Sequence, residues 1–143
     1  MTISRFEDIE AWQMGRQLCQ AIFVLAGQGG LSRDFSLEDQ IFRSSGSIMD
    51  NIAEGFDAGG NREFIRFLNY SKRSSTEVRS QLYRILDRQY CDQAAFETLY
   101  GQAASIRAKL GAFIHYLESL DPQSPSVKAR HTSIKRSAEK ANL

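Results

Sequence analysis

Proline is almost absent from this sequence of 143 residues. It holds only two prolines, Pro122 and Pro125, and both lie near the C-terminus. Proline removes a backbone donor and clashes with the preceding helical turn, so a chain without it can form long uninterrupted helices. No segment shows the alternation of apolar and polar residues that is typical of a strand. The sequence therefore favours an all-helical fold over residues 1–120.

Cysteine is equally scarce, and long hydrophobic runs are missing. Cys19 and Cys91 form neither a CxxC pair nor a disulfide framework, so we expect them to be buried thiols in a reducing compartment. No N-terminal stretch has the pattern of a secretory signal. The apolar runs are far shorter than the roughly 18–20 residues that cross a bilayer. These absences predict a cytoplasmic protein that does not enter a membrane.

Patterns typical of catalysis and metal binding are also missing. His115 and His131 lie far apart, and neither belongs to a set of cysteines, histidines and carboxylates large enough to hold a metal ion. His115 is expected to be a partly buried structural residue. The glycines of 27–30 match neither the Walker nor the dinucleotide-binding pattern, and no strand precedes them. The serines of 44–47 have no base at a plausible position and are expected to pack between close helices. We therefore expect no enzyme activity, no metal and no cofactor.

Charge is nearly balanced over the whole chain but unevenly distributed. The chain has 18 Lys and Arg against 17 Asp and Glu, a net charge of +1. Residues 1–120 hold 13 basic and 15 acidic side chains, a net of −2, whereas residues 121–143 hold 5 and 2, a net of +3. The length and the 42% of hydrophobic residues fit one globular domain. We expect one domain over 1–120, followed by a basic, flexible tail over 121–143.

Apolar residues recur at steps of three and four along four segments, which is the period of an amphipathic helix. These segments predict helices over about 6–26, 37–54, 62–88 and 93–120. Short loops between them imply antiparallel neighbours, and thus an up-down-up-down four-helix bundle. The last helix has the most regular inward face: Phe96, Leu99, Ala103, Ile106, Leu110, Phe113, Ile114 and Leu117.

Local signals mark the predicted helix ends. Ser36 with Asp39 three residues on resembles the capping-box start of a helix. Gly55 stands where a helix ends in a left-handed residue. Asn61 and Asp92 are the expected N-caps of the last two helices.

The first helix has an apolar arc that covers more than half of its circumference. A helix at the corner of a monomeric bundle needs less than that. Either this helix contacts another subunit, or the monomer has a thick core, and the pattern leaves both open. The residues of the arc are Ile9, Trp12, Met14, Leu18, Cys19, Ile22, Phe23, Leu25 and Ala26.

A row of polar residues lies opposite the apolar face of the second helix. Its members step by three, four, four and three residues: Gln40, Arg43, Ser47, Asn51 and Glu54. One interpretation is a solvated face. The other is a hydrogen-bonded seam against a neighbouring helix or subunit, since amide, carboxylate and guanidinium groups can satisfy one another. Spacing alone favours the solvated face.

Arginines form a stripe on the third helix, within about 80° of arc. Its members are Arg62, Arg66, Arg73, Arg84 and Arg88. Such a stripe is typical of a protein that binds the phosphate backbone of a nucleic acid. The alternative is an ordinary exposed helix, because Glu77 sits in the same stripe at i+4 from Arg73.

Three motifs in the middle of the chain are characteristic of a known family. They are R-x3-S-x3-NIAEG at 43–55, EF-x2-FL at 63–68 and S-x-E-x3-Q-L at 75–82. With them the segment 40–87 strongly resembles the four-helix-bundle protein family, also called the 23S ribosomal RNA intervening-sequence protein family. The resemblance extends more loosely over about residues 6–118.

The resemblance implies a left-handed up-down-up-down bundle that assembles into a ring, typically a homopentamer. It also links the chain to accessory proteins of diversity-generating retroelements, which bind nucleic acid and a reverse transcriptase. Because the family motif falls on the row from Gln40 to Glu54, we expect that row to be a polar network at a helix or subunit interface. We expect a non-enzymatic, homo-oligomeric scaffold that contacts RNA or DNA. The alternative is a protein–protein interaction module that has no nucleic-acid role.

Overall fold

The computed structural model describes residues 3–120; residues 1–2 and 121–143, including the predicted tail, lie outside the described part. Within this part the chain is all-α with no strand, which confirms the predicted all-helical class and the presence of four helices. None of these helices is long and apolar enough to cross a membrane. The elements are η1 (Phe6–Asp8), α1 (Glu10–Gln28), η2 (Gly30–Arg33), α2 (Phe35–Asp57), α3 (Asn61–Asp87) and α4 (Gln93–Glu118).

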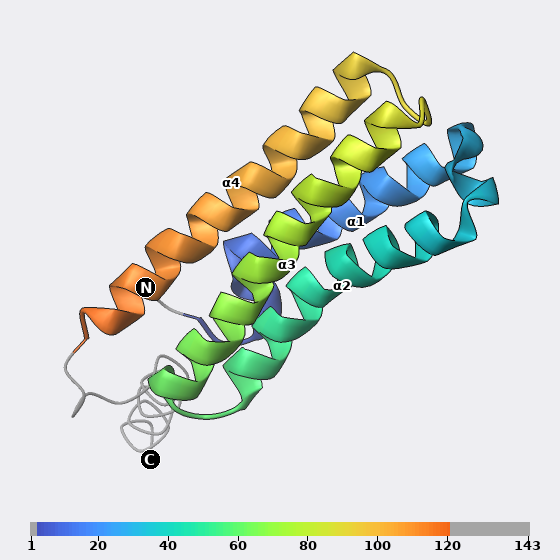
Figure 1. Cartoon of the computed structure of the whole chain (residues 1–143). Helices are drawn as coiled ribbons and strands as arrows, with labels where there is room; N and C mark the ends of the chain where they lie inside the picture. The colour runs from blue at the N-terminus through green and yellow to red at the C-terminus, as the bar shows by residue number, and fades with distance from the viewer. Residues whose placement is uncertain (1–2, 121–143) are drawn as a thin grey trace, which may run out of the picture.

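The four helices lie side by side along one axis (Figure 1). The connections from α1 to α2 and from α3 to α4 lie at one end of the bundle, and the connection from α2 to α3 lies at the other. Helix α3 packs extensively against both α2 and α4, whereas the contact between α1 and α4 is much sparser. The α1–α4 side of the bundle is therefore the more open one.

Buried aliphatic side chains from all four helices form one core. The inward face predicted for α4 is confirmed, with only Phe113 half-buried, and most apolar residues at helical spacing on α2 and α3 are buried as well. The wide apolar arc predicted for α1 is only partly buried: Leu18 and Ile22 lie in the core, but the side chain of Phe23 is 71% exposed. The apolar arc of α1 is wider than the core, so the side chains at its edge face outward. The largest fully buried side chains include Leu18, Ile22, Ile41, Ile48, Leu68, Leu82, Ile106 and Leu110.

Helix α2 begins earlier than the capping pattern predicts. Asp34, not Ser36, is its N-cap: the Asp34 carboxylate accepts a hydrogen bond from the backbone N–H of Leu37 at 3.4 Å. Two residues of the last α3–α4 turn, Arg88 and Tyr90, also bond to this carboxylate and hold it at the helix start. Asp34 therefore caps α2 in place of Ser36, because contacts from outside the helix hold its charged carboxylate at the helix start.

The sequence pattern predicts that α2 ends at Gly55, but the helix does not end there. The helix continues to Asp57, and Gly55 is buried against α3. A Cβ atom at this position would lie 2.9 Å from Cδ2 of Phe64 and closer still to Phe67. The glycine is required for the close approach of two helices. The left-handed residue of this connection is Gly59, with φ of 111°.

The other helix limits differ from the prediction by a few residues. The segment predicted as a helix from residue 6 is a 3-10 turn, η1, followed by α1, which ends two residues beyond the predicted 26. Asn61 is the first residue of α3 rather than its cap, because Gly60 holds the cap position. Asp92 is confirmed as the N-cap of α4, since its carboxylate accepts from the N–H of Ala95 at 2.8 Å. Such shifts reflect the weak definition of helix ends by local sequence.

The two cysteines are free thiols, as expected, but they are half-buried rather than buried. Burial is still the main reason why the pKa of both Cys19 and Cys91 is raised above its ordinary value.

Candidate nucleic-acid interface

Serine hydroxyls connect α2 and α3 along their shared interface. The hydroxyl of Ser74 donates to Oγ of Ser47 at 3.0 Å, and the buried Ser71 hydroxyl donates to the carbonyl of Ile48 at 2.8 Å. Asn51 joins this group through its own helix, because its Nδ2 donates to the carbonyl and hydroxyl of Ser47 at 2.8 and 2.9 Å. Small polar side chains thus let the two helices approach closely while their polar atoms remain paired.

The same interface continues toward the other end of α3. Nε2 of the buried Gln81 donates to Oγ of Ser44 at 2.9 Å, and the Ser44 hydroxyl donates to the Glu77 carboxylate at 3.2 Å. One turn further on, the guanidinium of Arg84 donates to Oε1 of Gln40 at 2.7 Å. A continuous row of polar contacts therefore runs along the α2–α3 interface; we call it the α2–α3 seam.

The structure divides the polar row predicted on the second helix. Gln40, Ser47 and Asn51 take part in the α2–α3 seam. Arg43 and Glu54 do not: Arg43 forms an exposed ion pair with Asp39 at 3.0 Å, one turn back on α2, and Glu54 is exposed. The row is thus part helix interface and part outer surface.

Four buried residues of the α2–α3 seam were not predicted to form a site. Their signal in the sequence is a set of small or amide side chains placed among apolar ones at helical spacing, where solvated charged residues are usual. This pattern indicates a polar helix contact but does not show which helix supplies the partner. These residues are Ser44, Ser71, Ser74 and Gln81.

The C-terminal half of the arginine stripe on α3 is tied to α2. Arg84 bonds to Gln40, and Arg88 forms an ion pair with Asp34. The Tyr90 hydroxyl donates to the same Asp34 carboxylate at 3.0 Å. These two arginines therefore hold the start of α2 against the end of α3 and are only partly available to a ligand.

The contacts around Asp34 change the proton affinities of this cluster. Partial burial raises the pKa of Asp34, but the hydrogen bonds from Arg88 and Tyr90 outweigh it and leave the pKa below its ordinary value. The bond to Asp34 raises the pKa of Tyr90, because deprotonation would remove the donor.

The N-terminal half of the stripe faces outward. Arg62 and Arg73 are exposed, and neither has an ion-pair partner within residues 3–120. Arg66 is also exposed and pairs with Glu63 of its own helix at 2.8 Å. In the described part of the chain, none of these three guanidinium groups forms a hydrogen bond or ion pair with another helix, and only that of Arg66 is ion-paired within α3.

Two aromatic rings lie among these arginines. The guanidinium carbon of Arg66 is 5.1 Å from the ring centre of Phe67 and 5.7 Å from that of Tyr70. The guanidinium carbon of Arg73 is likewise 5.7 Å from the ring centre of Tyr70. Phe67 and Tyr70 meet edge to face with 5.9 Å between their ring centres. Arginine and aromatic groups thus share one surface on α3.

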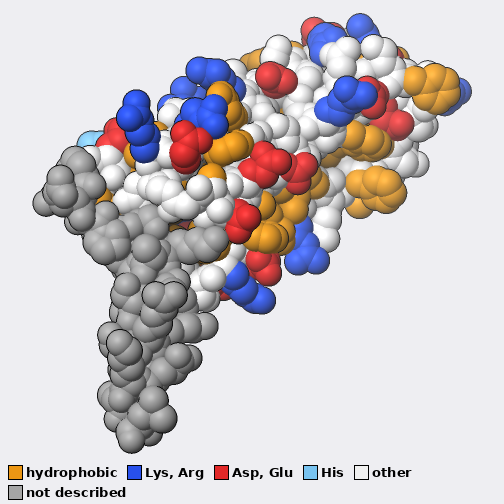
Figure 2. All heavy atoms as spheres, turned by 90° about the horizontal axis from the view of Figure 1, so that it is seen from below, with side chains coloured by type: hydrophobic (Ala, Val, Ile, Leu, Met, Phe, Trp, Pro, Cys, Tyr) orange, Lys and Arg blue, Asp and Glu red, His pale blue; other side chains and the backbone are white. Residues whose placement is uncertain are grey.

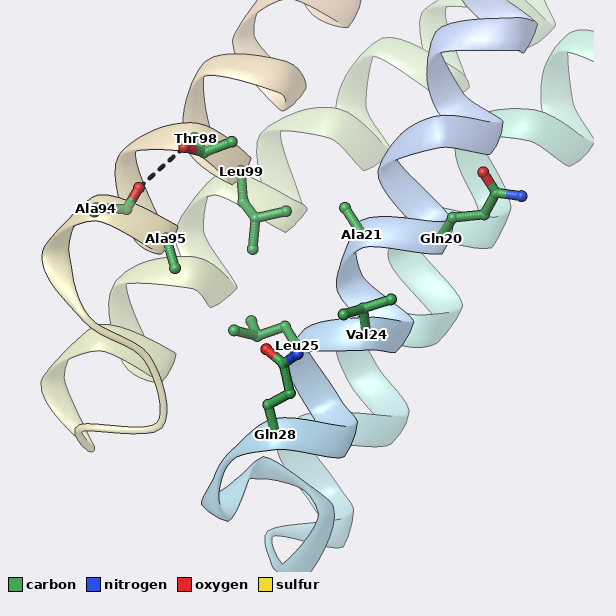
Figure 3. A pocket seen from close by; sticks show the side chains of 9 residues that line it. All are labelled: Gln20, Ala21, Val24, Leu25, Gln28, Ala94, Ala95, Thr98 and Leu99. Atoms are coloured by element: carbon green, nitrogen blue, oxygen red, sulfur yellow. Dashed lines mark hydrogen bonds between the residues drawn. The ribbon is translucent and has the colours of Figure 1, made fainter.

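A second surface feature is an open groove between α1 and α4. It has a volume of about 490 Å³, and Figure 3 shows Leu25 of α1 and Leu99 of α4 pointing into the space between the helices. Two further hollows, of about 380 and 320 Å³, lie along the same pair of helices. The first groove is lined by Gln20, Ala21, Val24, Leu25, Gln28, Ala94, Ala95, Thr98 and Leu99.

Hydrophobic side chains are also exposed near the α1–α2 connection. Phe23 is 71% exposed, Val24 55% and Phe35 77%. The ring of Phe23 lies 6.4 Å from that of the half-buried Phe42 on α2. Figure 2 shows hydrophobic side chains gathered in patches on the underside of the bundle, with charged side chains between them. Exposed groups of this kind mark contact surfaces when they lie together.

Within residues 3–120, no group of three or more His, Cys, Asp or Glu side chains is placed to hold a metal ion. His115, which the sequence places partly inside the core, is exposed, so that expectation is wrong.

The fold and these surfaces define an all-α four-helix protein whose second and third helices are joined by a polar seam. The chain belongs to the 23S rRNA-intervening sequence protein family, because the model of that family matches residues 7–112. This confirms the resemblance that the motifs of 43–82 indicate.

A solved structure supports the fold. The chain resembles a crystal structure of a protein with unknown function from the S23 ribosomal protein family of Bacteroides thetaiotaomicron VPI-5482, with 23% sequence identity and a TM-score of 0.67. The likeness covers 73% of this chain and 97% of the other. A search of curated proteins gave no match.

Proposed function

We propose that this chain is an up-down-up-down antiparallel bundle that assembles into a homo-oligomer, a homopentameric ring, and serves as a non-enzymatic scaffold that contacts RNA or DNA. The placement of the connections at alternate ends of the bundle supports the antiparallel topology, and the family membership supports the assembly. The observation that carries the nucleic-acid contact is the outward-facing half of the arginine stripe, where Arg62 and Arg73 have no ion-pair partner among the described residues.

The spacing of these arginines suits a phosphate backbone. Arg62 and Arg73 are 11 positions apart on α3, which is about 16 Å along the helix at 1.5 Å per residue. That distance corresponds to about five nucleotides along a duplex strand. Contacts of this type hold phosphates without selecting a base sequence. A ring would repeat the surface, so that weak contacts add up through a high effective concentration.

Light scattering and nucleic-acid titration test this proposal together. We expect a mass near five chains, and binding of labelled structured RNA or duplex DNA that weakens steeply between low and high salt, because counterions are released on binding. A monomeric mass would overturn the ring. Failure to bind either nucleic acid at low salt would overturn the nucleic-acid contact.

Paired variants locate the contact. Arg62→Ala with Arg73→Ala should lower the slope of log affinity against log salt by about 1 for each phosphate that the protein no longer neutralises. Arg16→Ala with Arg107→Ala removes the same charge from α1 and α4, where both arginines are exposed and have no ion-pair partner in the described part. An equal decrease for both double variants would show that net charge, and not this surface, is responsible.

A protein–protein interaction module is the second candidate function. The open groove between α1 and α4 and the exposed Phe23 and Phe35 favour it. The partner would be another protein, for example a reverse transcriptase, held by apolar surface. Such binding responds far less to salt than phosphate binding does, so the salt dependence separates the two functions.

A further inference from the structure

Tyr70 lies between two arginines of the outward-facing stripe. Arg66 precedes it by four residues and Arg73 follows it by three, so all three side chains share one surface of α3. Both guanidinium carbons are 5.7 Å from the ring centre, and Arg66 also lies 3.4 Å from the Tyr70 hydroxyl. Tyr70 itself is half-buried, which anchors the ring while part of it remains at the surface.

A nucleobase could replace one of these guanidinium groups on the ring. The arginines are exposed, and a cation–π contact at an exposed site is weaker than the stacking of a base on an aromatic side chain. The displaced guanidinium would remain next to the nucleotide and could bond to its phosphate through a charge-assisted hydrogen bond. The arrangement therefore offers one stacking surface with a phosphate partner on each side.

We propose that Tyr70 is a stacking platform for an unpaired base, with Arg66 and Arg73 holding the neighbouring phosphates. This inference rests on the proposed function and specifies its substrate class as single-stranded nucleic acid. In a duplex the faces of the bases are covered by neighbouring bases, so a duplex can contact the arginines through its phosphates but cannot stack on Tyr70. The protein thus binds single strands more tightly than duplexes of equal length.

Three labelled ligands separate stacking from phosphate binding: a single strand of about 12 adenosine nucleotides, an abasic strand of equal length, and a duplex of equal length. Fluorescence anisotropy with the full chain measures each affinity. Tyr70→Ala should weaken binding of the adenosine strand by about tenfold, which is typical of the removal of one base stack. It should leave the affinity for the abasic strand and for the duplex within about twofold.

Two further variants control for folding and for position. Tyr70→Phe keeps the ring and should bind like the unchanged protein. Tyr83→Ala removes a tyrosine that is 50% exposed on the same helix, and no described arginine lies over its ring. It should bind normally.

The outcomes distinguish this inference from the proposed function. Two results would overturn the stacking platform without affecting the proposed function. In the first, Tyr70→Ala leaves binding of the adenosine strand unchanged; in the second, it weakens binding of the abasic strand equally. If Tyr83→Ala weakens binding of the adenosine strand as much as Tyr70→Ala does, the placement of the stacking platform at Tyr70 is overturned. If the unchanged protein binds none of the three ligands, the proposed function fails as well.

Discussion

The backbone of Gly55 lies so close to Phe67 that a Cβ atom at Gly55 would come within 2.6 Å of the Phe67 Cβ. Real Cβ atoms do not approach other atoms this closely, so Gly55→Ala must push α2 and α3 apart. We expect it to destabilise the fold by about 1–3 kcal/mol, as overpacking of a core does. Urea denaturation followed by circular dichroism measures the change in midpoint.

Gly46 supplies the matched control within α2. A Cβ atom at Gly46 would meet nothing within 4 Å. Gly46→Ala should therefore stabilise the protein by about 0.5–1 kcal/mol, because alanine loses less conformational entropy in a helix than glycine does. Equal effects of the two substitutions would contradict the close approach at Gly55.

The lowered pKa of Asp34 predicts a loss of stability in acid. A carboxylate whose folded pKa lies below its ordinary value of 3.8 contributes stability above that value, and the contribution disappears as pH falls through the folded pKa. We expect Asp34→Asn to lower the melting temperature at neutral pH by several degrees, since it removes a charged cap and an ion pair. As the pH falls below about 4, the melting temperature of Asp34→Asn should fall less than that of the unchanged protein.

Melting curves between neutral pH and about pH 2 measure this difference. Curves of the two proteins that remain parallel throughout would show that Asp34 does not titrate differently in the folded and unfolded states.

Arg84 should matter for stability rather than for ligand binding. Its guanidinium donates to Gln40 at 2.7 Å, so Arg84→Ala should cost about 0.5–1.5 kcal/mol, the usual net value of one hydrogen bond. Arg62→Ala, which breaks no described contact, should leave the denaturation midpoint nearly unchanged. The two substitutions remove the same charge. If Arg84→Ala weakens the nucleic-acid affinity and Arg62→Ala does not, the division of the stripe into a half tied to α2 and an outward-facing half is contradicted.

Glu54 belongs to the NIAEG motif, yet it is exposed and forms no described bond to α3. If the outer part of the polar row meets a neighbouring subunit, Glu54→Ala and Arg43→Ala should shift the mass measured by light scattering toward the monomer, because both side chains are exposed. Ser47→Ala should instead lower stability, because it removes the acceptor of Ser74 at 3.0 Å. An unchanged oligomer mass for both Glu54→Ala and Arg43→Ala would refute a subunit contact at this row.

Local sequence determined much of this protein. The three- and four-residue steps of apolar side chains located all four helices and the inward faces of α2 to α4. Asp92 identified the start of α4, and the motifs of 43–82 identified the family. These features are predictable because the helical period and the capping of a helix depend on residues only a few positions apart.

The tertiary structure decided which polar groups meet. Ser47 and Ser74 are 27 positions apart, and Arg88 and Asp34 are 54 apart, so their contacts depend on how α2 and α3 rotate and pack against each other. The same packing places Gly55 at the close approach of α2 and α3 and joins Arg84 and Arg88 to α2. It leaves Arg62 and Arg73 exposed. Helical periodicity places side chains on a face, but only the docking of a second helix decides whether that face meets protein or solvent.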